Sequence, residues 1–437
     1  MTQETQVTGC PLCHIMDISM PAPDPAPLQE AFDHQDEVFA PAFAILHEAI
    51  AQQAFPSASV AVTHRNHLVA LKAVGHFTYK APEKTEVGSP FLASFARSGN
   101  STVNPSPVTP TTLFDLASLT KVVATTPMAM LLYERGLLDL DAPISAIIPE
   151  FITSAEKDPR RREVTLRMLL AHSSGLPAYE KLFLKARTRA ELLHAALTTP
   201  LTADPGTRAA YSDIGFIILG MALERLADES LDRFCQREIF APLAMTSTTF
   251  NPPQEIRAKI PPTADERDEP CGSDTPLRPL PKADDTPGVS HRSTLRQRIM
   301  QGEVQDENAS VLGGVAPQAG LFSAAADLAK FAHAMLNHGS PILRPDTVTL
   351  FTRRESAPAG TTRALGWDTP ANPSQSGKYF GPQSFGHLGY TGTSLWIDPA
   401  RQLSITLLTN RTWPDCSNHS IKQVRPKFHD AIIEALT

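Results

Sequence analysis

Segments with the apolar pattern of β-strands lie near both ends of this 437-residue chain, and helical patterns fill the interval between them. Near the N-terminus, apolar runs at residues 59–63 and 68–74 are separated by four polar residues, which indicates a hairpin. Two further runs, 394–397 and 403–408, precede the C-terminus. This placement predicts one layer made from both ends of the chain, with the intervening residues inserted into it.

Several segments have the length and apolar spacing of helices. Apolar residues recur at helical spacing in residues 37–53, and again on one face of 323–337, where Ser323 is the expected N-cap. Pro127 predicts a kink within the helix-length segment 118–135. The other predicted helices cover residues 166–170, 190–197, 214–226 and 426–436. The expected fold is of the α/β (α+β) class: an antiparallel sheet flanked by helices, built from N- and C-terminal segments, with an inserted all-helical domain.

Residues 1–36 carry five prolines among polar residues and predict a flexible N-terminal tail. Residues 37–437 are then expected to form one catalytic unit. Its expected parts are an α/β part at about 37–112 and 312–437, a helical part at about 113–311, and long surface loops at 81–110 and 251–295.

Charge and hydropathy exclude several classes of partner. The net charge of −7 provides no basic surface for nucleic acid or for an anionic membrane. The longest apolar stretch, residues 214–223, is about half of the ~20 residues that a membrane span requires. The N-terminus shows no secretory signal, so we expect a cytoplasmic protein, or a periplasmic one if a leader has been removed.

The five cysteines show no disulfide framework. Cys10, Cys13 and His14 match the C-x-x-C-H pattern of haem attachment, so a haem or metal protein is one alternative. No second Cys/His pair is spaced to complete a zinc site, and the motif lies in the proline-rich tail. We expect a solvated tail with free thiols, no metal and no organic cofactor.

Ser118 and Lys121 open a predicted helix with the spacing Ser-x-x-Lys. Positions three apart share a helix face, so the lysine amine can reach the serine hydroxyl. A serine in the first turn also lies beside free backbone N–H groups and the positive end of the helix dipole, which suits acyl transfer. The pattern alone is weak, because residues 154–157 also match it within a polar stretch.

Two further segments strengthen Ser118 as a candidate. Tyr211-Ser212-Asp213 precedes a predicted helix, and a tyrosine facing the serine could shuttle a proton to the leaving group. Taken alone, however, a packed aromatic with Ser212 or Asp213 as a helix N-cap is the better explanation of this segment. The second segment, residues 385–394, is rich in glycine before a strand, which marks close approach of the backbone to a ligand or neighbour. Its His387 taken alone is a structural histidine.

These elements, in this order, resemble the β-lactamase and penicillin-binding protein superfamily, in the branch of class C β-lactamases, D,D-peptidases and family VIII carboxylesterases. The resemblance extends from about Phe55 to the C-terminus. Besides the two segments above, it rests on Phe114-Asp115-Leu116-Ala117-Ser118-Leu119-Thr120-Lys121, Leu169-Leu170-Ala171-His172-Ser173-Ser174-Gly175-Leu176-Pro177, Pro242-Leu243-Ala244-Met245, Asp306-Glu307-Asn308-Ala309, Gly313-Gly314, Ala319-Gly320-Leu321-Phe322-Ser323 and Leu407-Leu408-Thr409-Asn410-Arg411.

The resemblance implies a role for each matched position. Ser118 would be the nucleophile, Lys121 its proton partner and Tyr211 the general base. His387-Leu388-Gly389 stands where many relatives have Lys-Thr-Gly and would line the substrate site. The oxyanion hole would consist of the backbone N–H groups of Ser118 and Tyr390.

Two positions depart from the family pattern. Asp213 stands where relatives more often have Asn, and a carboxylate close to Lys121 would raise the pKa of that lysine. The base role would then move to Tyr211, with Lys121 as an electrostatic anchor. His387 replaces a permanent cation with a group that ordinarily titrates near neutral pH, which favours uncharged esters or amides.

The sequence therefore predicts a serine hydrolase that forms an acyl-enzyme on small esters. Alternatives are a D,D-peptidase, β-lactamase or D-amino-acid amidohydrolase acting on peptidoglycan-like amides, and a penicillin-binding sensor module that acylates without turnover. The Gly-x-Ser-x-Gly and His-Glu-x-x-His motifs are absent from the sequence, which argues against an α/β-hydrolase and a zinc protease. The oligomeric state is left open.

Overall fold

The computed structural model describes residues 27–79, 103–153, 158–267, 296, 298–414 and 416–437. A six-stranded sheet joins the two ends of the chain in the order β1-β3-β2-β11-β10-β9. The strands are β1 (Gln29–Glu30), β2 (Ser57–His64), β3 (His67–Gly75), β9 (Phe385–Leu388), β10 (Ser394–Asp398) and β11 (Leu403–Thr409). All neighbours pair antiparallel except β1, which runs parallel to β3. The predicted sheet from N- and C-terminal segments is confirmed.

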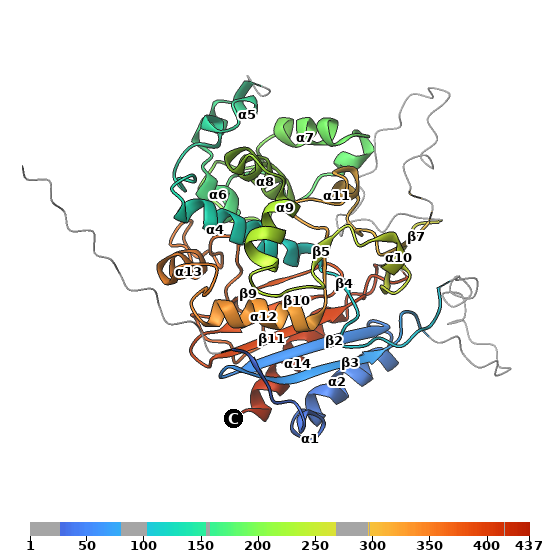
Figure 1. Cartoon of the computed structure of the whole chain (residues 1–437). Coiled ribbons are helices and arrows are strands. Elements are labelled where there is room, and N and C mark those ends of the chain that lie inside the picture. The colour runs from blue at the N-terminus through green and yellow to red at the C-terminus, as the bar shows by residue number, and fades with distance from the viewer. Residues whose placement is uncertain (1–26, 80–102, 154–157, 268–295, 297, 415) are drawn as a thin grey trace, which may run out of the picture.

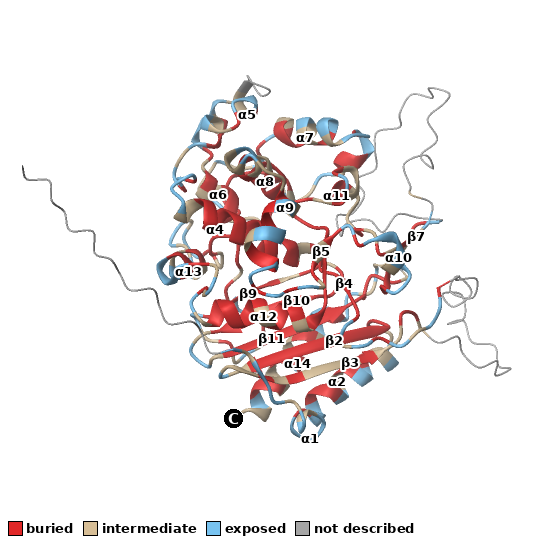
Figure 2. Cartoon of the chain, in the orientation of Figure 1, coloured by how far each residue is buried: buried red, intermediate tan, exposed pale blue. Residues whose placement is uncertain are grey.

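The pairing of β2 with β11 joins the N-terminal hairpin to the C-terminal strands, from Leu403 opposite His64 to Thr409 opposite Ala58. Helices α2 (Ala40–Ala51) and α14 (Ile421–Ala435) contact each other on one face, while α12 (Ala325–Leu336) contacts β2, β10 and β11 from the other (Figure 1). Both faces of the central strands are therefore covered, and Figure 2 shows them buried along their length.

The helical part lies on the α12 side of the sheet (Figure 1). Its central helix is α8, which is apolar on most sides and is capped by the Ser212 hydroxyl accepting from the Gly215 N–H. Helix α8 covers Asp213–Ala227, and the other α-helices of the described chain not yet given a range are α1 (Gln35–Val38), α4 (Thr126–Glu134), α5 (Glu150–Thr153), α6 (Leu166–Leu170), α7 (Arg189–Thr198), α9 (Leu231–Cys235), α10 (Gln254–Arg257), α11 (Glu307–Val311) and α13 (Pro345–Thr352).

Short elements complete the fold. Two small sheets have the orders β4-β8-β5 and β6-β7, and short 3₁₀- and π-helices connect the larger helices. The strands are β4 (Phe114–Asp115), β5 (Thr249–Phe250), β6 (Pro262–Asp265), β7 (Ile299–Gln301) and β8 (Leu321–Ser323). The 3₁₀-helices are Ala117–Leu119, Ile144–Ala146, Pro159–Glu163 and Leu182–Leu184, and the π-helices are Lys121–Thr125 and Gln236–Phe240.

Three predicted helices differ in detail. Residues 118–135 are not one α-helix but a 3₁₀-turn, a π-turn and then α4, and Pro127 lies in the first turn of α4, where its missing N–H costs little. Ser323 ends β8, so the N-cap of α12 is Ala324. The last helix begins at Ile421 and contains Pro426 in its interior.

The segments predicted as tail and loops are only partly described. Residues 27–36 contain β1 and the start of α1, whereas the Cys10, Cys13 and His14 motif lies outside the described residues. Residues 103–110 of the first predicted loop are described, as are α10 and β6 within the second. Cys235 is a buried free thiol, but Cys416 is disulfide-bonded, which the cysteine spacing did not predict. Within the described ranges, no helix combines the length and hydropathy needed to cross a membrane.

Arg161 holds the outer edge of the helical part together. Its guanidinium lies 3.9 Å from the centre of the Phe151 ring and donates to the Phe151 carbonyl at 2.8 Å. It also donates to the carbonyls of Thr199, at 2.9 Å, and Leu197. The buried side chain thus satisfies three main-chain acceptors at the ends of α5 and α7.

We expect Arg161→Met to lower the free energy of unfolding by about 3 kcal/mol, because three buried carbonyls lose their donor. Thermal and urea unfolding of the variant measure this loss. The KM for any substrate should stay unchanged, and an unaltered unfolding midpoint would contradict the assigned role.

Candidate active site

Ser118 sits at a sharp turn between β4 and the buried helical segment that follows. The Asp115 carboxylate shapes this turn by accepting from the N–H groups of Ala117 and Gln305, both at 2.8 Å. Ala117 has a φ of +47°, a left-handed conformation that costs a non-glycine residue roughly 1–2 kcal/mol. The chain therefore reverses immediately before Ser118, whose side chain is half-buried.

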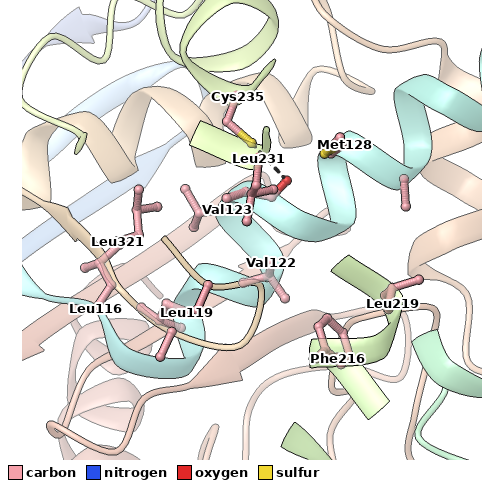
Figure 3. Packing of buried hydrophobic residues seen from close by; sticks show 14 of the residues in the cluster. Leu116, Leu119, Val122, Val123, Met128, Phe216, Leu219, Leu231, Cys235 and Leu321 are labelled. Atoms are coloured by element: carbon pink, nitrogen blue, oxygen red, sulfur yellow. Dashed lines mark hydrogen bonds between the residues drawn. The ribbon is translucent and has the colours of Figure 1, made fainter. Parts of the chain in front are cut away.

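The helical segment after Ser118 is packed on all sides (Figure 3). Val122 and Val123 are fully buried, and Phe216 and Leu219 of α8 belong to the same apolar cluster. On the α9 side, the Cys235 thiol donates to the Ala124 carbonyl at 3.5 Å, the contact drawn as a dashed line. This packing fixes the backbone that carries Ser118 and Lys121.

Lys121 is fully buried and its amine has three partners. The Nζ atom is 3.1 Å from the Ser118 Oγ, 2.7 Å from the Asp213 Oδ1 and 2.9 Å from the Gln318 carbonyl oxygen. The predicted contact between Ser118 and Lys121 is therefore present. The sequence did not predict a role for Gln318. Its contact is made by a main-chain oxygen, which every residue type has, so the residue type gives no signal.

Tyr211 joins Ser118 to Asp213. Its hydroxyl is 2.6 Å from the Ser118 Oγ and donates to the Asp213 Oδ1 at 2.9 Å. The four predicted side chains at Ser118, Lys121, Tyr211 and Asp213 thus form one connected hydrogen-bond network, although residues 118 and 211 are 93 positions apart.

The segment from His172 to Ala178 holds the Tyr211 loop along its length. The His172 Nδ1 accepts from the Ser212 N–H at 3.0 Å, and the Ala178 carbonyl accepts from the Asp213 N–H at 2.8 Å. The His172 ring also lies 4.8 Å from the Tyr211 ring, centre to centre. From the sequence, the motif around His172 was known only as one of the segments shared with the family. In the structure it positions Tyr211.

Burial sets the protonation of the two proton-carrying groups. It lowers the pKa of Lys121, and the contact with Asp213 opposes that shift without reversing it. The expected contact is present and Asp213 does raise the pKa of Lys121, but burial, which was not considered, has the larger effect and lowers it overall. Burial, reinforced by Asp213, raises the pKa of Tyr211 well above its ordinary value, so Tyr211 is a phenol at neutral pH.

These directions favour Lys121 as the proton acceptor. In the structure the Lys121 Nζ donates to the Ser118 Oγ, the Asp213 Oδ1 and the Gln318 carbonyl oxygen. Once the amine has lost one proton, two N–H donors remain for Asp213 and Gln318, and the lone pair can face the Ser118 hydroxyl. Tyr211 keeps its proton and can pass it on.

His387, on β9, is buried beside Tyr211, with 6.0 Å between ring centres. Its Nδ1 is 2.8 Å from the Leu388 carbonyl and donates to it, so Nε2 carries a lone pair, for which the described residues offer no partner. Burial, together with the nearby charges of Lys121 and Arg363, lowers the pKa of His387 well below its ordinary value. The expectation of titration near neutral pH was wrong: this histidine is neutral there.

Arg363 is the charged residue of the site that the sequence analysis missed. It lies in the chain between α13 and β9, where its guanidinium is 5.7 Å from the Tyr211 ring centre and forms an ion pair with Asp368. No motif surrounds it in the sequence, so only the tertiary structure reveals that it borders Tyr211.

The turn between β9 and β10 is fastened to the Ser118 turn. The hydroxyls of Thr391 and Thr393 donate to the carbonyls of Asp115, at 2.8 Å, and Leu116, at 2.9 Å. Gly389 lies so close to this contact that a Cβ atom there would be 1.9 Å from the Thr393 Oγ1 and 2.5 Å from the Leu116 oxygen. The two segments predicted to supply oxyanion N–H groups, at Ser118 and Tyr390, are therefore neighbours.

Other candidates from the sequence do not join this network. The second Ser-x-x-Lys match, at 154–157, lies outside the described residues. Within the ranges that are described, no group of three or more His, Cys, Asp or Glu side chains is arranged to hold a metal ion.

A family model and a curated protein both match most of this chain. A family model described as Beta-lactamase matches residues 36–421. A curated protein of Salmonella agona named "Putative D-alanyl-D-alanine carboxypeptidase" is 31% identical over 385 residues, which cover 84% of this chain and 81% of that protein.

Solved structures at lower identity share the fold. One, titled "EstCE1, a hydrolase with promiscuous acyltransferase activity", has a TM-score of 0.66 at 20% identity and covers 91% of this chain and 99% of its own. A class C beta lactamase from Rhodobacter sphaeroides has a TM-score of 0.59 at 22% identity, covering 91% of this chain and 99% of its own.

We expect Gly389→Ala to reduce hydrolytic activity by about 10²-fold or more, because a Cβ atom would push the β9–β10 turn away from Ser118. Steady-state kinetics on any accepted ester measures this loss. Gly381→Ala is the matched control, since a Cβ atom there meets nothing nearer than 4.0 Å and should leave the rate unchanged. Equal activity of both variants would contradict the assigned contact.

Asp213→Asn should move the acidic limb of the pH profile of kcat/KM to lower pH, by on the order of one unit. Asp213 raises the pKa of Lys121, so removing its charge lets the lysine lose its proton at a lower pH. Asp398→Asn serves as the control, because that buried carboxylate pairs with Arg401 at the far end of β10. A shift of the basic limb instead would mean that Lys121 works as an ammonium.

Proposed function

The chain belongs to the beta-lactamase family of hydrolases, and on that premise we propose that it is a carboxylesterase that acylates Ser118 with small esters. One observation carries the proposal: the Ser118 Oγ is 3.1 Å from the Lys121 Nζ and 2.6 Å from the Tyr211 hydroxyl. A nucleophile in contact with both a proton acceptor and a proton donor has what acyl transfer requires.

Acylation uses these groups in turn. The Ser118 proton moves to the Lys121 amine as the Oγ bonds to the ester carbon, and the carbonyl π electrons move onto the carbonyl oxygen. The N–H groups of Ser118 and Tyr390 stabilise that oxygen. When the tetrahedral intermediate collapses, the bond to the leaving oxygen breaks, Tyr211 protonates the alkoxide, and the Lys121 ammonium reprotonates Tyr211 through the network.

Deacylation reverses the proton path. Water attacks the acyl carbon while its proton passes through the same network to the Lys121 amine, and collapse of the second intermediate returns a proton to the Ser118 oxygen. The acid leaves, and the site is restored without metal or organic cofactor. Tyr211, which gave a proton to the leaving group, now receives one from water, and Lys121, which took the Ser118 proton, now returns one to Ser118, as microscopic reversibility requires.

The preference for esters is supported by His387. A neutral imidazole carries no positive charge, so His387 offers no ion pair to a substrate carboxylate. A substrate whose recognition depends on a negative charge at this position therefore gains nothing from His387.

A second candidate activity is a D-alanyl-D-alanine carboxypeptidase, the name of the Salmonella agona relative. The observation that favours it is Arg363, a cation near Tyr211 that could bind a terminal carboxylate if it exchanged Asp368 for the substrate. That exchange breaks an existing ion pair, which is why we rank the activity second.

We expect the wild type to hydrolyse p-nitrophenyl butyrate much faster than nitrocefin or a peptide ending in D-Ala-D-Ala, and Ser118→Ala to lose activity on all three. The loss on the ester should be at least 10³-fold, because the proposed mechanism forms its covalent intermediate on the Ser118 Oγ. Initial rates measure the substrate preference and the loss in Ser118→Ala, and the mass of the trapped acyl-enzyme shows whether Ser118 is acylated.

Other outcomes of the same assays select the alternatives. Faster release of D-alanine than of p-nitrophenol would establish the carboxypeptidase, and faster nitrocefin cleavage a β-lactamase. A stable adduct of one acyl group without turnover would indicate a sensor. Full activity of Ser118→Ala would remove Ser118 from the mechanism.

A further inference from the structure

Arg425 of α14 is a buried cation whose hydrogen bonds all go to one turn. Its Nη2 donates to the carbonyls of Gly389, at 2.7 Å, and Thr393, at 3.0 Å, and its Nε donates to the Gly392 carbonyl at 3.2 Å. No carboxylate of the described chain forms an ion pair with it, and the other charge close to it is the positive Arg411.

The other two carbonyls of this turn, those of Tyr390 and Thr391, accept hydrogen bonds from side chains of β11 and of the chain that follows it. The Arg411 Nε donates to the Tyr390 carbonyl at 2.7 Å, and the Thr409 Oγ1 donates to the Thr391 carbonyl at 2.9 Å. Every carbonyl from residue 389 to residue 393 is thus held by a side chain of β11, α14 or the chain between them. The main-chain dipoles of the turn are fixed before any substrate arrives.

Holding a turn with a buried positive charge carries a large cost in free energy, because the charge loses its hydration. Burying a cation without a carboxylate costs several kcal/mol, which carbonyl dipoles offset only in part. A neutral amide side chain could donate to the same carbonyls without that cost. The charge at Arg425 therefore calls for a role beyond fastening the turn.

The Gly389 carbonyl and the Tyr390 N–H are the two ends of one peptide group. A charge-assisted hydrogen bond to the oxygen draws electron density away from the nitrogen and makes its N–H a stronger donor. We propose that Arg425, through the Gly389–Tyr390 peptide, strengthens the Tyr390 N–H as the donor that stabilises the oxyanion.

This inference rests on the proposed function, in which the Tyr390 N–H is one of two oxyanion donors. Arg425 exchanges no proton with the substrate and forms no bond to it. It acts weakly on the neutral carbonyl oxygen of the acyl-enzyme, and most strongly while that oxygen carries negative charge, in the tetrahedral intermediates of acylation and deacylation. Its contribution should therefore affect the transition state and not substrate binding.

The test compares Arg425→Lys, Arg425→Gln and Arg425→Met with the wild type on p-nitrophenyl butyrate. Lysine keeps the charge, glutamine keeps a donor without charge, and methionine keeps neither. We expect Arg425→Gln and Arg425→Met to lower kcat about tenfold with KM unchanged, less than the roughly 10²–10³-fold cost of losing a whole oxyanion donor. Arg425→Lys should stay within about threefold of the wild type.

Two further readouts separate polarisation from loss of structure. The inhibition constant of butylboronic acid, whose tetrahedral adduct places an oxygen in the oxyanion hole, should rise in parallel with the fall in kcat. The infrared carbonyl stretch of a ¹³C=O-labelled acyl-enzyme should move to higher frequency in Arg425→Gln. Arg161→Met is the control, because that buried arginine also donates only to main-chain carbonyls, at α5 and α7, and should change neither readout.

The outcomes are distinct. Equal kcat and carbonyl frequency in Arg425→Gln and Arg425→Lys would overturn the role of the charge, even with the proposed function intact. If Arg425→Met does not fold, the comparison of Arg425→Lys with Arg425→Gln still decides whether the charge has the proposed role. Failure of the proposed function itself would show instead as full activity of Ser118→Ala and no acyl-enzyme in the wild type.

Discussion

The contacts of the buried Lys121 amine are the constraint on which the rest of the site depends. A fully buried amine must find its partners inside the protein, and it finds them in three separate segments. These are Ser118 in the 3₁₀-turn that precedes Lys121, Asp213 at the start of α8, and the main chain at Gln318 before β8. Placing one amine therefore fixes the relative positions of the nucleophile, the Tyr211 loop and a strand of the small sheet.

The large sheet supplies the other half of the site. The pairing of β2 with β11 brings the two chain ends together, and β10 and β9 continue the sheet from there. The turn after β9 is then held from two directions: Thr391 and Thr393 join it to the Ser118 turn, and Arg425 binds its carbonyls from α14. The C-terminal helix thus contributes to the chemistry without touching a substrate.

Burial also decides which groups carry protons. It lowers the pKa values of Lys121 and His387 and raises that of Tyr211, because each charged form loses hydration. At neutral pH the site therefore offers a phenol donor and a neutral imidazole acceptor beside the lysine. The residue type alone does not give the state of His387, since free histidine titrates near neutrality.

Local sequence predicted the layout of the fold and the pairing of Ser118 with Lys121. Spacing of three on a helix puts Ser118 and Lys121 on one face, and apolar runs at both chain ends specify a shared sheet, because both patterns act between near neighbours. The site residues from the separate segments, Tyr211 and Asp213, were found only through the resemblance and their order. Tertiary structure alone decided that burial outweighs Asp213 at Lys121, that Arg363 borders Tyr211, and that Arg425 holds the turn at Gly389. Those facts depend on dehydration and on contacts between distant segments, which arise only when the chain has folded.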